Sequence, residues 1–249
     1  MKIVGITGAI GHGKTALAHA LCELELTGLI LESGQLIVEV INRWLPQLTI
    51  PQDAHDLEAI NGWLEQLIPI AKQQLHVDLK LENLKLSQAA VDVNPNDYAK
   101  LFIYLEQLKA NPSRQTDTIT NDNKEWHRPL LQWLGGYLAS KSEGIWYQEI
   151  KNRAKLADEQ GHKLFVATGL RFPADEQAVR RAGGVVVGIE RPGQDERDAT
   201  DPTERERQRI NCYTTVVNNG TLDDLKRCAE TLWIDLQANK LQNRYLTKS

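Results

Sequence analysis

Residues Lys2–Thr15 read KIVGITGAIGHGKT, and this stretch decides the fold. Lys2–Thr7 is short, apolar and β-branched, which predicts a buried strand that stops at Gly8. The eight residues Gly8–Thr15 fit the pattern G-x-x-x-x-G-K-[ST]. Because a helix is expected to begin near Gly13, the pattern lies between a strand and a helix, where it is typical of a phosphate-binding loop. A chain of this length matches by chance about once in a hundred sequences.

Each residue type in this loop has a physical reason to be there. Glycines let the backbone turn tightly and direct its N–H groups at phosphate oxygens, which the N-terminus of a helix also favours. Lys14 would supply a point charge to the β- and γ-phosphates of ATP, and the Thr15 hydroxyl would reach Mg²⁺. The candidate ATP-binding residues are Gly8, Ala9, Ile10, Gly11, His12, Gly13, Lys14 and Thr15, and Thr15 is the candidate metal ligand.

Strand and helix patterns alternate on both sides of the middle of the chain. Further strands are predicted at 29–31 (ending at Glu32), 163–168, 185–190 and 214–217. Helices are predicted at 35–45, 128–141, 146–160 and 173–182, followed by a last helix that Thr221 caps. This alternation predicts an α/β fold with a parallel, doubly wound, five-stranded sheet.

The middle of the chain has a different character. Residues 57–75 and the run that follows Pro95 carry apolar side chains at helical spacing. Asn111–Glu125 is polar, rich in Asn, Asp and Thr, and is expected to be a mobile loop. We therefore expect a core over 1–45 and 126–239, a helical insertion over 46–125 and a tail over 240–249.

The composition is that of an ordinary soluble globular protein. The chain has 249 residues, 41% of them hydrophobic, and 29 basic against 33 acidic side chains give a net charge of −4. Without a basic surplus, binding to polymeric nucleic acid loses most of its electrostatic support. No apolar run is long enough to span a bilayer, and the strand at Lys2 leaves no room for a signal peptide, so a cytoplasmic location is expected. The three cysteines form no CxxC pair and fit a reduced compartment.

From Arg128 onward, an ordered set of motifs resembles the phage-type deoxynucleoside monophosphate kinases of the P-loop nucleoside monophosphate kinase group. The motifs are RPLLQWLG at 128–135, GIW at 144–146, LRFPADE at 170–176, GGVVVGIERP at 183–192, DPTE at 201–204 and VNNGTL at 217–222. Together with the Gly8–Thr15 loop they cover about half of the chain. The resemblance implies a three-layer P-loop NTPase fold, and an Mg²⁺-dependent transfer of the γ-phosphoryl of ATP to a deoxynucleoside 5′-monophosphate. Nucleotides would then be the small-molecule partners.

Two arginines are candidates for catalysis beside Lys14. Arg171 follows a predicted strand at its carboxyl end, where ligands bind in open α/β sheets, and is the candidate for gripping the acceptor phosphate. A structural ion pair with Glu176 or another carboxylate is the alternative. Arg191 follows the next strand and begins a region, about 191–211, that the resemblance implies to be a lid over ATP. The alternative for this region is a solvated face whose arginines pair with interleaved acidic residues.

Two further groups complete the candidate site. The resemblance implies that the loop with Asn218 and Gly220 borders the adenine, although the same residues also make a good turn before a helix. Arg128 and Gln132, one turn apart on one helix face, are candidates for holding the base or phosphate of the acceptor. An exposed arginine at a helix start is an equally good interpretation of Arg128.

The chain departs from the family pattern in three places. Gly169 stands where the family usually carries aspartate, so Glu32 becomes the candidate carboxylate beside Mg²⁺ and the substrate. Asp201 replaces a histidine, and His12 stands where serine is common and is expected to offer only its backbone N–H. These departures keep two alternatives open: a P-loop kinase for another small acceptor, such as dephospho-coenzyme A or a nucleoside, and an ATP-binding protein without turnover. The oligomeric state stays open, with a homodimer among the options.

Overall fold

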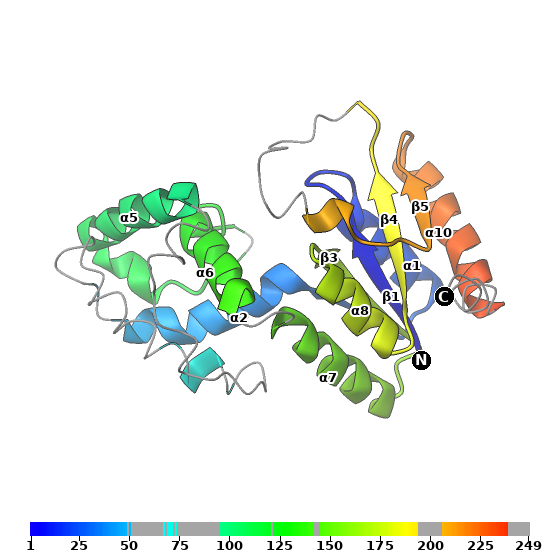
Figure 1. The fold of residues 1–249 in the computed structure, drawn as a ribbon, viewed down its shortest axis with the longest axis horizontal. Coiled ribbons are helices and arrows are strands. Elements are labelled where there is room, and N and C mark those ends of the chain that lie inside the picture. Colours follow the sequence, from blue (N-terminus) through cyan, green and yellow to red (C-terminus); the bar gives the residue numbers. More distant parts are fainter. Residues whose placement is uncertain are drawn as a thin grey trace. The chain divides into compact units, whose positions relative to one another are not determined.

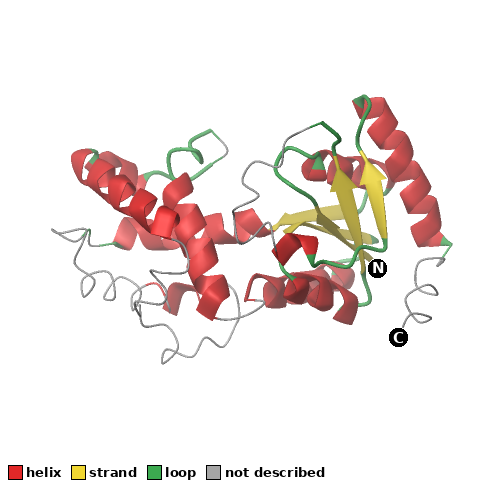
Figure 2. Ribbon diagram, turned by 45° about the horizontal axis from the view of Figure 1, so that its top comes forward, coloured by secondary structure: helices red, strands yellow, loops and turns green. Residues whose placement is uncertain are grey.

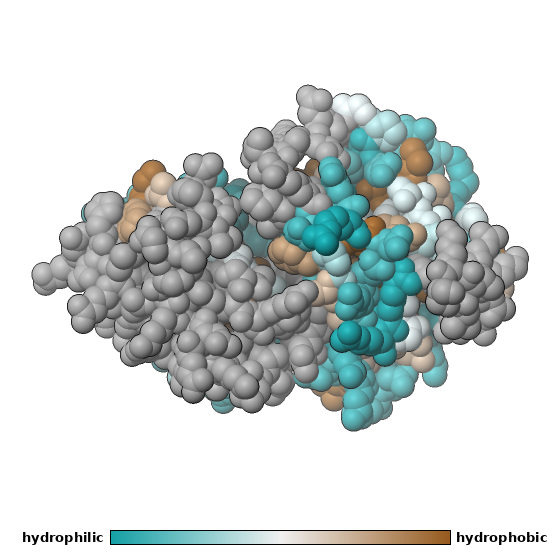
Figure 3. All heavy atoms as spheres, viewed as in Figure 1, coloured by the Kyte–Doolittle hydropathy of each residue, from teal (hydrophilic) through white to brown (hydrophobic). Residues whose placement is uncertain are grey.

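The computed structural model describes residues 1–48, 50, 67, 69–71, 73, 95–120, 122–141, 145–193 and 206–238. The chain divides into two compact units, one of Met1–Ser33 with Tyr147–Ser249 and one of Gly34–Trp146. The first contains the sheet and the second is helical (Figure 1). Hydrophilic side chains cover much of the visible surface of the first unit (Figure 3). Within the described ranges, we find no helix with the length and apolar character that crossing a membrane requires.

The first unit is built on a five-stranded sheet in which every pairing is parallel (Figure 2). The strand order is β2-β3-β1-β4-β5, which places β1 between β3 and β4. The bounds are β1 Lys2–Thr7, β2 Gly28–Glu32, β3 Leu164–Leu170, β4 Val185–Glu190 and β5 Thr214–Val217. All five predicted strands and their parallel direction are therefore confirmed.

Helices cover both faces of this sheet, as the alternating pattern predicts. They are α1 Lys14–Leu24, α7 Ile145–Glu159, α8 Pro173–Arg181 and α10 Leu222–Gln237, and Figure 1 shows α7 beside α8. On one face, Val4 and Ile6 of β1 share a core with apolar residues of α1 and α10. On the other face, Gly5 lies against Leu170 and Val179, the latter from α8. Burial of each such leucine-sized side chain contributes roughly 2 kcal/mol.

The strand β3 runs two residues farther than the apolar pattern predicts. Ile6 pairs with Thr168, and Thr7 with Leu170, so the register shifts by one residue and Gly169 forms a bulge. Gly169 has a φ of 83°, in the left-handed region, which glycine adopts at little cost. The Thr7 hydroxyl closes the irregularity with a 2.8 Å hydrogen bond to the carbonyl of Leu170. The bulge therefore sets the direction in which the chain leaves the sheet after Leu170.

The second unit contains the helices α2, α5 and α6 and two short 3₁₀ helices. Their bounds are α2 Ser33–Trp44, η1 Leu45–Gln47, α5 Pro95–Ala110, η3 Pro112–Thr116 and α6 Arg128–Lys141. Fully buried side chains such as Trp44, Leu101 and Tyr104 form its interior. The predicted helices at 35–45 and 128–141 and the helix start at Pro95 are confirmed. Most of the predicted helical run 57–75 lies outside the described residues, and its described members 67, 69–71 and 73 are helical.

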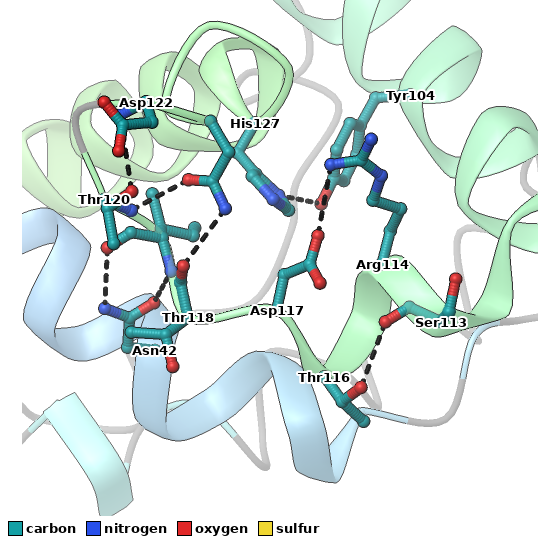
Figure 4. Close-up of polar contacts among 12 residues, drawn as sticks. Asn42, Tyr104, Ser113, Arg114, Thr116, Asp117, Thr118, Thr120, Asp122 and His127 are labelled. Carbon is teal, nitrogen blue, oxygen red and sulfur yellow. Dashed lines mark hydrogen bonds and ion pairs between the residues drawn. The ribbon is translucent and has the colours of Figure 1, made fainter.

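The sequence predicts a mobile loop over Asn111–Glu125, and this prediction is wrong for Pro112–Thr116, which form a 3₁₀ helix, whereas the other described residues of the segment are loop and turn. The segment forms η3 and then packs onto α2, where Ile119 is buried. The carboxamide of Asn42 accepts a 2.8 Å hydrogen bond from the N–H of Ile119 and donates a 3.2 Å bond to its carbonyl (Figure 4). One carboxamide can satisfy both main-chain groups of a buried residue because it carries a donor and an acceptor. Local polar composition does not reveal such a long-range partner.

Candidate functional site

The carboxyl edge of the sheet carries most of the residues that the sequence selects. Since all strands are parallel, their carboxyl ends lie along one edge, the usual place for ligands in open α/β sheets. In the order of the strands, this edge carries Glu32, Arg171, the Gly8–Thr15 loop, Arg191 and Asn218. Neighbouring strands lie about 4.8 Å apart. The two arginines therefore follow the two strands that flank the strand leading into the loop.

The Gly8–Thr15 loop joins β1 to α1 and approaches the ends of β4 and β5 closely. A side chain at Gly8 would place its Cβ 2.5 Å from the carbonyl oxygen of Ile189. Gly13 has a φ of 100°, and a Cβ there would lie 2.6 Å from the Asn218 side-chain nitrogen. Glycine is required at Gly8 because a Cβ would meet the backbone of β4, and at Gly13 because of its positive φ. The loop is thus enclosed by the sheet edge.

Positive charge and the N-terminus of α1 lie at this loop. The Lys14 ammonium donates 2.8 Å hydrogen bonds to the carbonyl oxygens of Gly8 and Ala9, which holds it across the loop. The first turn of α1 contains no acidic residue, so the positive end of the helix dipole is not neutralised there. A loop with these features attracts an anion such as phosphate.

Thr15 and Glu32 bring two oxygen atoms together beside the loop. The Thr15 hydroxyl donates a 2.8 Å hydrogen bond to a carboxylate oxygen of Glu32 at the end of β2. Mg²⁺ prefers oxygen ligands and keeps several water or phosphate oxygens in its shell. In the part of the chain that the structure describes, no group of three His, Cys, Asp or Glu side chains could hold a metal ion. The two residues therefore fit an Mg²⁺ that phosphate oxygens also coordinate.

Arg171 is held by its main chain and keeps its side chain available. Asp175, fully buried at the start of α8, accepts 2.7 Å and 2.6 Å hydrogen bonds from the N–H groups of Arg171 and Phe172. Glu176 forms its 2.7 Å ion pair with Arg180, so the alternative of a structural pair with Arg171 is not found. The Arg171 guanidinium is exposed and has no ion-pair partner among the described residues.

His12 uses its side chain, contrary to the expectation that it offers only its backbone N–H. Its ring is 95% buried, since 5% of the residue is exposed. The ring Nδ1 lies 3.4 Å from the carbonyl oxygen of Ile189 and 3.4 Å from the N–H nitrogen of Arg191. The backbone N–H of His12 donates to the carbonyl of Ala9 at 3.3 Å. The expectation fails because β4 ends beside the loop, a long-range relation that the local motif does not contain.

Asn218 also fastens the loop. Its side-chain NH₂ donates a 2.9 Å hydrogen bond to the carbonyl of His12, and its backbone N–H donates to the carbonyl of Glu190 at 2.7 Å. Two residues on, a side chain at Gly220 would collide with the Asp224 carboxylate. The same carboxylate bonds the Thr221 N–H, which confirms Thr221 as the cap of α10. The contact of Asn218 with the loop is one that the sequence does not predict.

Arg128 and Gln132 belong to the second unit and lie one turn apart on α6. The Arg128 guanidinium bonds the Glu125 carboxylate through two nitrogens, one at 2.6 Å. This hydrogen bonding lowers the pKa of Glu125 and raises the pKa of Arg128. Gln132 is exposed. The Arg128 guanidinium is therefore bonded to Glu125. That Arg128 and Gln132 bind an acceptor stays a prediction.

The predicted lid is described only at its two ends. Arg197, Asp201 and Arg205 lie outside the described residues. Arg209 forms a 2.8 Å ion pair with Glu206 on the surface, in line with the solvated-face alternative for that residue. Exposed pairs of this kind contribute little to stability, typically about 0.2–1 kcal/mol.

The second unit also holds a buried polar cluster that the sequence does not single out. The Tyr104 hydroxyl and the Nδ1 of His127 are 3.0 Å apart, and both residues are fully buried (Figure 4). Burial lowers the pKa of His127 and raises that of Tyr104, in the latter case with help from the charge of Asp117. The ring of Trp126 packs edge-on against both. Among the described residues the ring of His127 is therefore bonded through Nδ1 alone, because its buried Nε2 has no hydrogen-bond partner there.

Taken together, the sheet edge can bind a chain of phosphates, neutralise its charge and reach a second anion. The loop supplies N–H groups and an ammonium, Thr15 and Glu32 supply oxygen ligands, and Arg171 and Arg191 supply guanidinium groups on either side. This combination is suited to phosphoryl transfer, which depends on positioning and electrostatics. No protein-family model matches the chain, and no curated protein matches it significantly.

Proposed function

We propose that the protein is an ATP-dependent kinase that phosphorylates a nucleoside 5′-monophosphate, with deoxynucleotides as the expected acceptors. The observation that carries the proposal is the order of groups along the sheet edge. The Gly8–Thr15 loop lies between Arg171 and Arg191, each of which directly follows a strand next to β1. A three-layer P-loop-type fold is the architecture that this strand order and loop support.

In this proposal, the loop holds the triphosphate of the substrate ATP. Lys14 exchanges its two neutral carbonyl partners, Gly8 and Ala9, for phosphate oxygens, which form stronger charge-assisted hydrogen bonds. The Thr15 hydroxyl would continue to donate its hydrogen bond to the Glu32 carboxylate, and its oxygen would be the ligand that holds Mg²⁺. The metal ion, when bound, supplies neutralisation of the charge on the β- and γ-phosphates.

The reaction requires one bond to form and one to break. An oxygen of the acceptor monophosphate forms a bond to the γ-phosphorus, while the bond between that phosphorus and the β–γ bridging oxygen breaks. ADP leaves with the electron pair, and the acceptor becomes a diphosphate. No general base is needed because a phosphate monoester is already an anionic nucleophile. Arg171 holds the acceptor phosphate, and Arg191 stabilises the charge that develops between the two nucleotides.

The test is a steady-state assay of ADP release with a panel of ribo- and deoxynucleoside monophosphates. We expect turnover with at least one of them, and loss of that turnover by about 10²–10³-fold in Lys14→Ala. Lys155→Ala is the matched control, because Lys155 is an exposed lysine of α7 that pairs only loosely with Glu159, at 3.9 Å.

The same panel includes dephospho-coenzyme A and nucleosides. If only these compounds are phosphorylated, the protein is still a kinase, but its acceptor is not a nucleoside monophosphate. ATP binding without turnover on any acceptor would overturn it in favour of a nucleotide-binding protein.

A further inference from the structure

His12 connects the phosphate loop to the point where the chain leaves β4. Its Nδ1 lies at 3.4 Å from the Arg191 N–H nitrogen and from the Ile189 carbonyl oxygen. Its Nε2 is enclosed and has no hydrogen-bond partner among the described residues. All polar contact of the ring therefore passes through Nδ1, on the side that faces the end of β4.

The main chain of residue 12 is fixed from the other side. The Asn218 side chain donates a 2.9 Å hydrogen bond to the carbonyl of His12, and Asn218 itself is bonded to Glu190 at the end of β4. The loop thus carries one polar link to the end of β4 and one to the end of β5. Of these, the imidazole is the link that reaches Arg191.

The end of β4 is held from the side of β5 by the Asn218 N–H, which bonds the carbonyl of Glu190. The β1–β4 pairing stops at Thr7 and Gly188, and the β4–β5 pairing stops at Glu190 and Val217. The N–H of Arg191 therefore comes after the last paired residue, and His12 is its partner among the described residues. A histidine at this position extends the ordered main chain by one residue beyond the strand.

We propose that His12 is a positioning residue that holds the main chain of Arg191 against the phosphate loop. Because the imidazole joins the loop to the main chain of Arg191, the backbone that carries the guanidinium is held next to the place of the triphosphate. The contribution of His12 to the reaction rests on the proposed kinase function. The link that His12 makes between the loop and Arg191 does not. Preorganised charge of this kind accelerates a reaction because no reorganisation is needed when the charge develops.

Three variants separate a positioning role from simple filling of space. His12→Asn keeps an amide oxygen or nitrogen near the place of Nδ1, His12→Gln moves that group outward to the place of Nε2, and His12→Ala removes it. Nδ1 accepts from the Arg191 N–H only when it carries no proton, so only the asparagine, whose amide oxygen can accept at that place, should restore this bond.

The first measurement is residue-resolved amide hydrogen exchange at Arg191 without nucleotide, with the buried Val187 of the same strand as reference. We expect exchange at Arg191 about fivefold or more faster in His12→Ala and His12→Gln, and restored protection in His12→Asn. Exchange at Val187 should be the same in all four proteins. Unchanged exchange at Arg191 in His12→Ala, or equal protection in the asparagine and glutamine variants, would overturn the proposal.

The second measurement is kinetic. In His12→Ala we expect kcat to fall by about tenfold or more while KM for ATP changes less than twofold, with kcat recovering in His12→Asn. A rise of KM alone would contradict a positioning role. If the unaltered protein phosphorylates no acceptor, the proposed function fails by itself, and the exchange measurement still decides the role of His12.

Discussion

Arg171 shows how a single side chain is made ready for a ligand. Asp175 fixes its main chain, and Glu176 is occupied by Arg180, so the guanidinium is left without an ion-pair partner among the described residues. We expect Arg171→Ala to raise KM for the acceptor and to lower kcat by about 10²–10³-fold, with ATP affinity unchanged. Initial-rate kinetics with both substrates varied would measure this. The control is Arg181→Ala, since Arg181 is an exposed arginine of α8 whose partner within the described ranges is Gln177.

Gly169 has a backbone conformation that an aspartate, or any other residue with a Cβ, adopts only at a cost. At a φ of 83° any side chain is strained, so Gly169→Ala and Gly169→Asp should each destabilise the fold by about 1–2 kcal/mol. Aspartate tolerates this conformation somewhat better than alanine. Urea unfolding of the two variants measures the cost. Stability equal to that of the unaltered protein in both would show that the bulge is not needed.

The residue scale is also where the sequence is least informative. The eight-residue loop motif predicts the ligand chemistry of Lys14 and Thr15, but it contains nothing about the imidazole of His12. The contact between His12 and Arg191 joins residues that are 179 positions apart in the sequence. The contact between His12 and Asn218 joins residues that are 206 positions apart. Such partners become visible only when the strands are placed side by side.

Among the elements, the helices α5 and α6 are joined by the buried pair Tyr104–His127. Burial lowers the pKa of His127 below its ordinary value of 6.5, so the unfolded chain binds a proton more readily than the folded one. Stability should therefore fall as the pH drops below about 6.5 toward the folded pKa. Thermal unfolding between pH 7.5 and 5 should show a smaller pH-dependent loss in His127→Asn than in the unaltered protein. His19→Asn, at an exposed position of α1, should leave the loss unchanged.

Elements with a strong local pattern were predictable. Apolar or β-branched runs predict the strands of the sheet. Pro95 and Thr221 predict helix starts, because proline suits the first position of a helix and threonine suits its cap. The bulge at Gly169 and the packing of Asn111–Glu125 on α2 were not, because both depend on a partner strand or helix. Local periodicity predicts the type of an element better than its end.

At the scale of the whole molecule, the strand order is the decisive feature. Alternating strands and helices predict a parallel sheet, but they do not predict that β1 lies between β3 and β4. This order is what places Arg171 and Arg191 on both sides of the Gly8–Thr15 loop. The division into units likewise assigns α6, with Arg128 and Gln132, to the unit of Gly34–Trp146. Sequence alone predicts the parts of the site, and topology brings the parts of the first unit together.

The most direct measurement follows the γ-phosphate itself. The protein is incubated with Mg²⁺, ATP labelled at the γ-phosphate and a mixture of deoxynucleoside monophosphates, and the labelled products are separated. The proposed function predicts label in the β-phosphate of a nucleoside diphosphate, and none there with Lys14→Ala. Label that stays in ATP, or that appears only as inorganic phosphate, would contradict it.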